Sequence, residues 1–246
     1  MGTSKSYGGL KGNPNWPKLS RTMTSACKAG PISKPHLNRI ISNIPGIIGG
    51  SEYGGKGKSQ IIGQSGIRTA QKLGSVLNEI KSKGFSSTVS GLGFRIDSNT
   101  TPSSVTNFLL EHCAGVASSL DDTAAKEAER KLLDEIGGEA KTFLDLEQNF
   151  KEVLDSYGID ELIIKFYAYY LNEHLSIGFY EKLVKDKGRE NAGNLYSQLK
   201  DFLIEKLKNI SIEKDLTKID WSGSEGETLV TDIFQQTIGA FENNEN

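Results

Sequence analysis

The residues of this chain that most resemble a nucleotide-binding site are Gly57, Lys58 and Ser59, within the run GGSEYGGKGKSQIIGQ. A phosphate-binding loop ends in the same three residue types, because its backbone amides and lysine hold phosphate oxygens. Such a loop also needs a glycine five positions before Gly57, where this chain has Glu52. A carboxylate there would repel the phosphates, and no apolar strand ending in aspartate follows to hold magnesium. The sequence therefore indicates a flexible basic loop.

The histidines and cysteines give no sign of a metal centre or a reactive thiol. They are His36, His112, His174, Cys27 and Cys113. The three histidines lie far apart in the sequence, and neither cysteine has a second one at metal-ligand spacing. No two carboxylates show the arrangement of a general acid and base. We therefore expect a buried thiol at Cys113, no metal, no intrinsic cofactor and no enzymatic activity.

A further reactive group is the backbone amine of Gly2, which removal of Met1 would expose. An α-amine has a pKa of about 7.7–8.0, whereas a lysine amine has a pKa of about 10.4. At pH 7 roughly a tenth of α-amines are neutral nucleophiles, against well under a thousandth of lysine amines. Because glycine has no Cβ, Gly2 can also enter a narrow tunnel. Gly2 is thus the predicted site of modification.

The residues that follow Gly2 offer hydroxyls, one ring and small residues to a partner. They are Thr3, Ser4, Ser6, Tyr7, Gly8 and Gly9. Further along, Trp16 is a large apolar side chain between Asn15 and Pro17, and it could dock on a partner or on the chain's own body. We expect self-docking. The opening MGTSKS also matches the N-myristoylation pattern M-G-x-x-x-[ST], which requires a eukaryotic host.

The elements that would position these residues fall into three segments. Residues 1–31 are rich in glycine and proline and lack periodicity, so we predict a disordered tail that carries the modification site. Residues 32–95 form a basic, glycine-rich segment with two predicted helices, over 36–48 and 65–83. Pro45 is expected to end the first helical run and Gly84 the second, and a loop or short extended piece is expected after Gly84.

Residues 96–246 are predicted to be an acidic, all-α body, because apolar residues recur there at helical spacing. Thr101 is expected to cap the first helix, and Asp121 or Asp122 the second. An aromatic stripe on the longest helix is expected to be core. The predicted helices cover residues 103–120, 123–136, 142–157, 159–187, about 189–209, and 226–241.

The charges divide the chain unevenly. From Met1 to Arg95 there are 14 Lys and Arg against 2 Asp and Glu, and from Ile96 to Asn246 there are 15 against 29. Residues 1–95, which we call the basic arm, either lie across the acidic body or bind nucleic acid or an acidic partner. Both interpretations stay open. No run reaches the roughly 18 apolar residues of a membrane span, and no apolar secretory core follows Met1, so a cytoplasmic protein without membrane contact is expected.

The opening MGTSKSYGG, the Gly/Pro-rich tail and the acidic helical body together resemble the B subunit of bacterial Qat anti-phage defence systems. The specific part of this resemblance is Met1 to Gly9. It implies a non-catalytic protein that works beside an ATPase, a QueC-like enzyme and a TatD-like nuclease. It also implies that the QueC-like enzyme activates a deazaguanine carboxylate with ATP and joins it to the amine of Gly2 as a covalent adduct.

Overall fold

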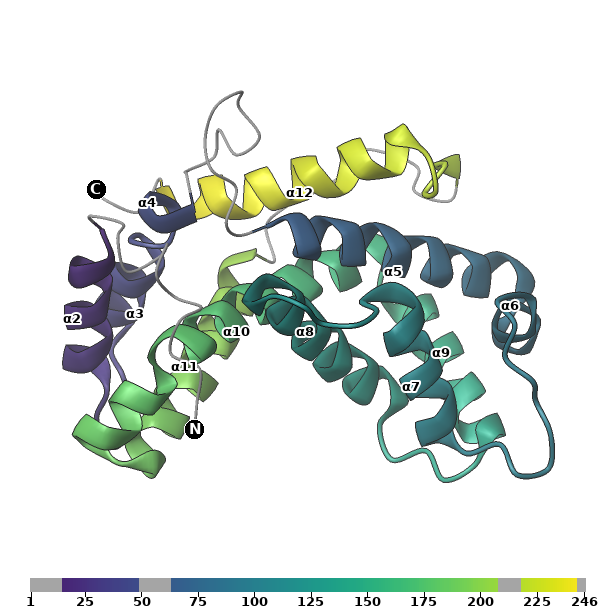
Figure 1. The fold of residues 1–246 in the computed structure, drawn as a ribbon, viewed down its shortest axis with the longest axis horizontal. Coiled ribbons are helices and arrows are strands. Elements are labelled where there is room, and N and C mark those ends of the chain that lie inside the picture. Colours follow the sequence, from purple (N-terminus) through teal and green to yellow (C-terminus); the bar gives the residue numbers. More distant parts are fainter. Residues whose placement is uncertain (1–14, 49–62, 208–217, 243–246) are drawn as a thin grey trace.

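The computed structural model describes residues 15–48, 63–207 and 218–242. This part of the chain is all-α, as predicted, and contains no strand (Figure 1). Its helices are α2 (Trp16–Ala26), α3 (Lys34–Ile41), α4 (Pro45–Ile48), α5 (Gln64–Lys83), α6 (Phe85–Gly91), α7 (Pro102–Cys113), α8 (Leu120–Gly137), α9 (Phe143–Ser156), α10 (Ile159–Lys187), α11 (Arg189–Leu207) and α12 (Ser224–Glu242).

The long helix α10 is the centre of the core. Phe166, Tyr167 and Tyr170 of this helix are fully buried. Helices α2, α5, α8, α11 and α12 all contact α10 (Figure 1). A helix that is apolar on nearly every side must be covered on every side, which explains its position. The expectation that its aromatic stripe is core is confirmed; Tyr180, near its end, is half-buried against the ring of Tyr196.

Helices α5 and α12 lie side by side along one edge of the molecule. Two glycines of α5 leave room for large rings, one from α10 and one from the segment just before α12. A Cβ on Gly74 would lie 2.1 Å from the ring of Trp221, and one on Gly66 would lie 2.8 Å from the ring of Tyr170. Gln71 completes the junction by donating to the carbonyl of Trp221 over 2.9 Å. These glycines of the basic segment therefore serve close packing.

Helices α7, α8 and α9 each begin with a capping box, in which the cap and the third helical residue exchange hydrogen bonds. Thr101 caps α7 as predicted, and Thr142 caps α9. The prediction for α8 is wrong by two or three residues: Ser119 is the cap, and Asp122 is the third residue, which returns the bond. Helix α7 ends at Cys113, before the predicted end, and Gly115 follows with a φ of 70°.

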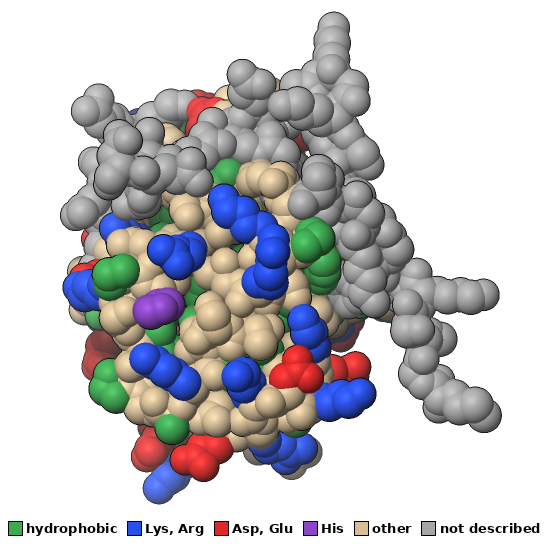
Figure 2. Space-filling view, turned by 90° about the vertical axis from the view of Figure 1, so that its left-hand side faces the viewer, with side chains coloured by type: hydrophobic (Ala, Val, Ile, Leu, Met, Phe, Trp, Pro, Cys, Tyr) green, Lys and Arg blue, Asp and Glu red, His purple; other side chains and the backbone are tan. Residues whose placement is uncertain are grey.

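The predicted disorder of residues 1–31 is wrong from Trp16 onward, where α2 forms. Leu19, Met23 and Ala26 recur at helical spacing, and each is at most 1% exposed. Pro17 lies in the first turn, where its missing N–H costs nothing. This short apolar stripe outweighs the glycines and prolines around it. Helices α2 and α3 lie at one end of the molecule (Figure 1), and their outer face carries Lys and Arg side chains (Figure 2).

Two further predictions in the basic segment need correction. The stretch after Gly84, expected to be a loop, forms α6, because Phe85 packs against the rings of Phe143 and Phe150. Gly84 itself ends α5 as predicted, with a φ of 88°. The first helical run, within 36–48, was expected to end at Pro45; α3 ends earlier, at Ile41, and Pro45 instead begins the short helix α4.

The basic segment and the acidic body share one hydrophobic core. Buried side chains from α2, α3 and α5 belong to the same cluster as those of the helices after residue 96. Charges also meet across the composition boundary, since Arg68 pairs with Asp122 at 2.8 Å and Lys34 with Glu205 at 2.7 Å. The change in composition at residue 95 therefore does not separate two independently packed units.

Candidate functional site

The predicted modification and recognition residues at the start of the chain lie outside the described residues. They are Gly2, Thr3, Ser4, Ser6, Tyr7, Gly8 and Gly9. The phosphate-loop-like run with Gly57, Lys58 and Ser59 also lies outside them. What the structure does place is the attachment point of each of these two segments on the folded body.

The N-terminal segment joins the body at Asn15 and Trp16. The side-chain amide of Asn15 donates to the carbonyl of Gly46 over 2.8 Å. The ring of Trp16 stacks on that of Phe179, with centroids 4.3 Å apart, and Gly178 of α10 leaves room for it. Trp16 thus docks on the chain's own body, as expected. This contact fixes the point from which the first fourteen residues extend.

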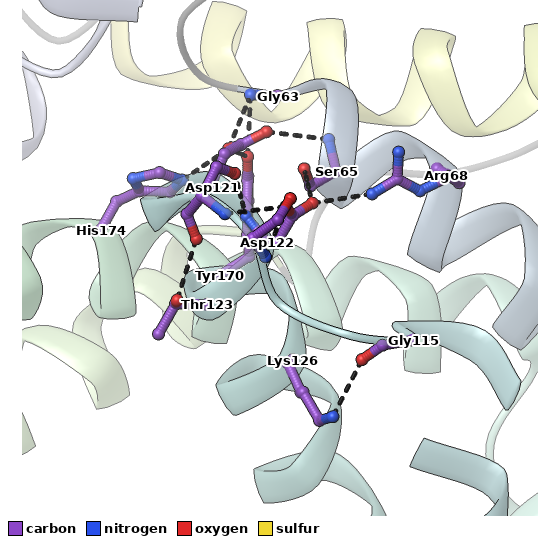
Figure 3. Close-up of polar contacts among 12 residues, drawn as sticks. Gly63, Ser65, Arg68, Gly115, Asp121, Asp122, Thr123, Lys126, Tyr170 and His174 are labelled. Atoms are coloured by element: carbon purple, nitrogen blue, oxygen red, sulfur yellow. Dashed lines mark hydrogen bonds and ion pairs between the residues drawn. The ribbon is translucent and has the colours of Figure 1, made fainter. Parts of the chain in front are cut away.

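The segment 49–62 joins the body at a buried polar cluster, in which Asp121 is central (Figure 3). One carboxylate oxygen of Asp121 accepts from the Gly63 amide at 3.2 Å and contacts His174 Nε2 at 2.9 Å. The same oxygen accepts from the Tyr170 hydroxyl, and the other oxygen accepts from the Ser65 amide at 2.8 Å. Burial alone would raise the pKa of Asp121, but the bonds from His174, Tyr170 and Ser65 outweigh it and lower the pKa to about 2.

Asp122 forms the second half of the cluster (Figure 3). One of its oxygens accepts from the Ser65 hydroxyl at 2.7 Å and from the Arg68 guanidinium at 2.8 Å. The other accepts from the backbone amides of Ser118 and Ser119. Burial opposes ionisation, but these donors hold the pKa of Asp122 well below its usual range. Both aspartates are therefore charged acceptors at neutral pH.

This cluster fastens the first turn of α5 to the N-terminus of α8 and the middle of α10. The Ser65 amide has no helical partner at the start of α5, and Asp121 accepts its hydrogen bond. The Gly63 amide donates both to Asp121 and, over 2.8 Å, to the Tyr170 hydroxyl. The Ser65 hydroxyl donates to Asp122, away from His174, so the residues do not form a nucleophile, base and orienting acid in series. The arrangement is that of a structural clamp.

A second buried polar pair lies between α7 and α8. Glu129 is fully buried, and neither of its carboxyl oxygens has a hydrogen-bond partner of normal geometry among the described residues. Burial raises the pKa of Glu129 well above its usual range, because the charged form loses its hydration there. Cys113 lies beside it, is 1% exposed, and has a raised pKa, first because of its burial. The prediction that Cys113 is a buried thiol is confirmed.

No group of three or more His, Cys, Asp or Glu among the described residues is placed to hold a metal ion. Within the same ranges, no helix is both long and apolar enough to cross a membrane.

The decisive comparison is with protein families. The model of the family described as Qat anti-phage system associated protein QatB matches residues 54–241, well over half of the chain. This chain belongs to the QatB family. The resemblance drawn from its first residues is confirmed at the level of the family, although the match itself begins after them. Comparison with curated proteins and with solved structures gave no match.

Membership of the QatB family makes this protein a component of a Qat anti-phage system. The matched region contains α5 to α12, and hence the whole Asp121–Asp122 cluster, whereas α2, α3 and the predicted site at Gly2 precede it. Sequence reasoning missed the cluster. Its signal was local: the run SLDD at 119–122 has the S-x-x-D spacing of a capping box. No local pattern pointed to Ser65 or His174, which approach only in the folded chain.

Proposed function

We propose that this protein is the non-catalytic substrate and scaffold of its Qat system. Met1 is removed, and a QueC-like partner joins a deazaguanine nucleobase to the exposed amine of Gly2. An ATPase and a TatD-like nuclease are further partners of the helical body. The observation that supports this most is membership of the QatB family. The role of Gly2 rests on the opening MGTSKSYGG and on the chemistry of its amine.

The proposed reaction balances without any catalytic group from this chain. The deazaguanine carboxylate first attacks ATP on the partner, which gives an acyl-adenylate and pyrophosphate. The neutral amine of Gly2 then attacks the acyl carbon, a C–N bond forms as the C–O bond to AMP breaks, and the amine proton passes to a base or to solvent. The chain contributes a nucleophile that is partly neutral at pH 7 and has no side chain beside it.

The attachment of Asn15 and Trp16 to the body supports the scaffold part of the proposal. Because these two residues are held by Gly46 and Phe179, the acceptor segment starts from a fixed place on a packed helical domain. A partner can therefore bind the body and receive the N-terminal residues at the same time.

The mass of the intact protein, purified after co-expression with the rest of its Qat system, tests this proposal. The expected mass is that of the chain without Met1 plus one deazaguanine acyl group, and fragmentation should place that group on Gly2. Gly2→Val keeps an α-amine but adds a branched side chain, so it should lose most of the modification and the protection against phage. The matched control Gly12→Val should keep both. A wild-type mass equal to the Met1-free chain alone, with all partners present, rejects the proposal.

A further inference from the structure

The exposed surface of α2, α3 and the loop between them carries a set of cations that we call the α2–α3 basic face. It consists of Lys18, Arg21, Lys28, Lys34 and Arg39. All five residues are exposed, and the first acidic residue of the whole chain is Glu52. Figure 2 shows Lys and Arg side chains spread over this side of the molecule, with acidic side chains towards its lower part and edges.

The helix geometry directs these cations outward. Lys18 and Arg21 are three positions apart on α2, so they share one side of the helix. The opposite side carries Leu19 and Met23, which are buried in the core. Lys182 at the end of α10 donates to Ser20 of α2 over 2.8 Å and adds another cation beside the face.

Most of this charge is not neutralised by the protein itself. Lys34 pairs with Glu205, at 2.7 Å, on the exposed surface. Among the described residues, no carboxylate lies within ion-pair distance of Lys18, Arg21, Lys28 or Arg39, whereas several cations elsewhere on the surface are paired. An unneutralised patch of one sign attracts a partner of opposite sign and raises the rate of association.

Hydrogen bonds from α11 also hold the loop of the α2–α3 basic face in place. Asn194 of α11 donates to the carbonyls of Lys28 and Gly30, at 3.0 and 2.7 Å, which fixes the loop between α2 and α3. Gln198 accepts from the Ile32 amide at 2.8 Å in the same loop. Because the loop is already ordered, a partner that binds here loses less free energy to ordering it.

We propose that the α2–α3 basic face docks an acidic surface of a partner protein, and that this partner is the one that receives the N-terminal residues. The inference rests on the proposed function, in which Gly2 is the acceptor. Asn15 is thirteen positions after Gly2, so the chain from one to the other can span at most about 45 Å. A protein seated on the basic face therefore has Gly2 within reach of a site on its own surface.

The composition of the face favours a protein over a nucleic acid. Specific binders of duplexes commonly neutralise about six to ten phosphates, and four cations without partners supply fewer. Binding of single strands uses stacked aromatic rings, and the basic face has none. The nearby ring of Trp16 is stacked on Phe179.

The test compares two charge-reversed variants of the full chain. The first, Lys18→Glu/Arg21→Glu/Lys28→Glu, alters the face. The second, Lys81→Glu/Lys141→Glu/Lys151→Glu, makes the same change in net charge at exposed sites on α5 and α9 and just before α9. Circular dichroism checks folding, and if the first variant unfolds, Lys18→Gln/Arg21→Gln/Lys28→Gln replaces it.

Binding is measured by interferometry against each of the other purified proteins of the Qat system, and against a short DNA duplex, at about 50 and 200 mM salt. One system protein should bind the wild type and the control variant, and should bind the face variant at least about tenfold more weakly at low salt.

Three results overturn the docking proposal: equal affinity of the two variants, no system protein that binds the wild type, or a loss confined to the duplex. The intact mass of the wild-type protein distinguishes a failure of the docking proposal from a failure of the proposed function. A missing acyl group rejects the role of Gly2, whereas equal affinities reject only the docking surface.

Discussion

The side chain of Asp121 binds polar groups from two other helices, α5 and α10, at the same time. It accepts hydrogen bonds from two backbone amides at the start of α5 and from Tyr170, and it contacts His174. These partners come from segments about fifty residues before and after it. The charge of the carboxylate is therefore stabilised in a place where solvent is largely excluded, and the bonds depend on the whole fold being formed.

Asp121→Asn should destabilise the protein by about 2 kcal/mol at pH 7. The pKa of Asp121 is lowered from 3.8 to about 2 on folding, so the ionised carboxylate stabilises the folded state at any pH above about 4. That contribution is lost as the pH falls from about 4 towards 2, because both states then bind the proton. The difference between variant and wild type should therefore shrink in urea denaturation at pH 3. The exposed control Asp186→Asn should change little at either pH, and an Asp121 effect that is the same at pH 7 and pH 3 contradicts this account.

At the scale of single residues, the sequence indicated local signals and missed distant ones. Thr101 was identified as a cap because its bond partner is three residues away, and Cys113 was identified as buried from its place in an apolar helix. The partners of Asp121 could not be identified, since nothing in the sequence near residue 121 specifies that Ser65 and His174 will approach. The buried Glu129 was missed for the same reason, because its burial depends on the helices packed around it.

At the scale of elements, long periodic helices were predictable and short ones within glycine-rich sequence were not. Helix α5 was predicted within one residue at its start because five apolar residues share one face. Helices α2 and α6 are eleven and seven residues long. Helices this short are marginal in isolation, so they depend on packing, which local composition does not report.

The junction of α5 and α12 gives an element-scale prediction. Gly74→Ala should destabilise the protein by about 1–3 kcal/mol and change the fluorescence of Trp221, because the new Cβ would lie 2.1 Å from that ring. Gly193→Ala is the matched control, since it also lies within a helix but a Cβ there meets nothing within 4 Å. The control should be stabilised by about 0.5–1 kcal/mol, the usual gain of alanine over glycine in a helix. Equal thermal unfolding of the two variants is incompatible with the close contact.

At the scale of the whole molecule, composition suggested segments and the structure has one core. The basic segment and the acidic body differ sharply in charge, yet their apolar side chains form a single cluster. Surface charge determines which parts of a chain repel or attract each other. Burial depends instead on the spacing of apolar residues, which is helical on both sides of residue 95. The all-α class was therefore predictable, and the integration of α2, α3 and α5 into the body was not.

A single core predicts that the molecule unfolds in one step. Trp16 reports on the docking of α2 against α10, and Trp221 reports on the packing of the segment before α12 against α5. In Trp16→Phe and Trp221→Phe, the remaining tryptophan's fluorescence and the circular dichroism of that variant should give the same urea midpoint. An earlier transition at Trp16 than in circular dichroism would mean that α2 and α3 detach separately from the rest.

The fastening of Asn15 to Gly46 and of Trp16 to Phe179 has a consequence for turnover. In the proposed reaction, an enzyme bound beside α2 would meet the first residues as part of the same complex, at an effective concentration on the order of millimolar. A few small residues offer little contact area, so by themselves they would be held weakly. Because the N-terminal segment is attached to the docked body, weak binding of these residues would be enough for the proposed reaction. Weak binding would also let the enzyme release the modified N-terminus and bind the next chain.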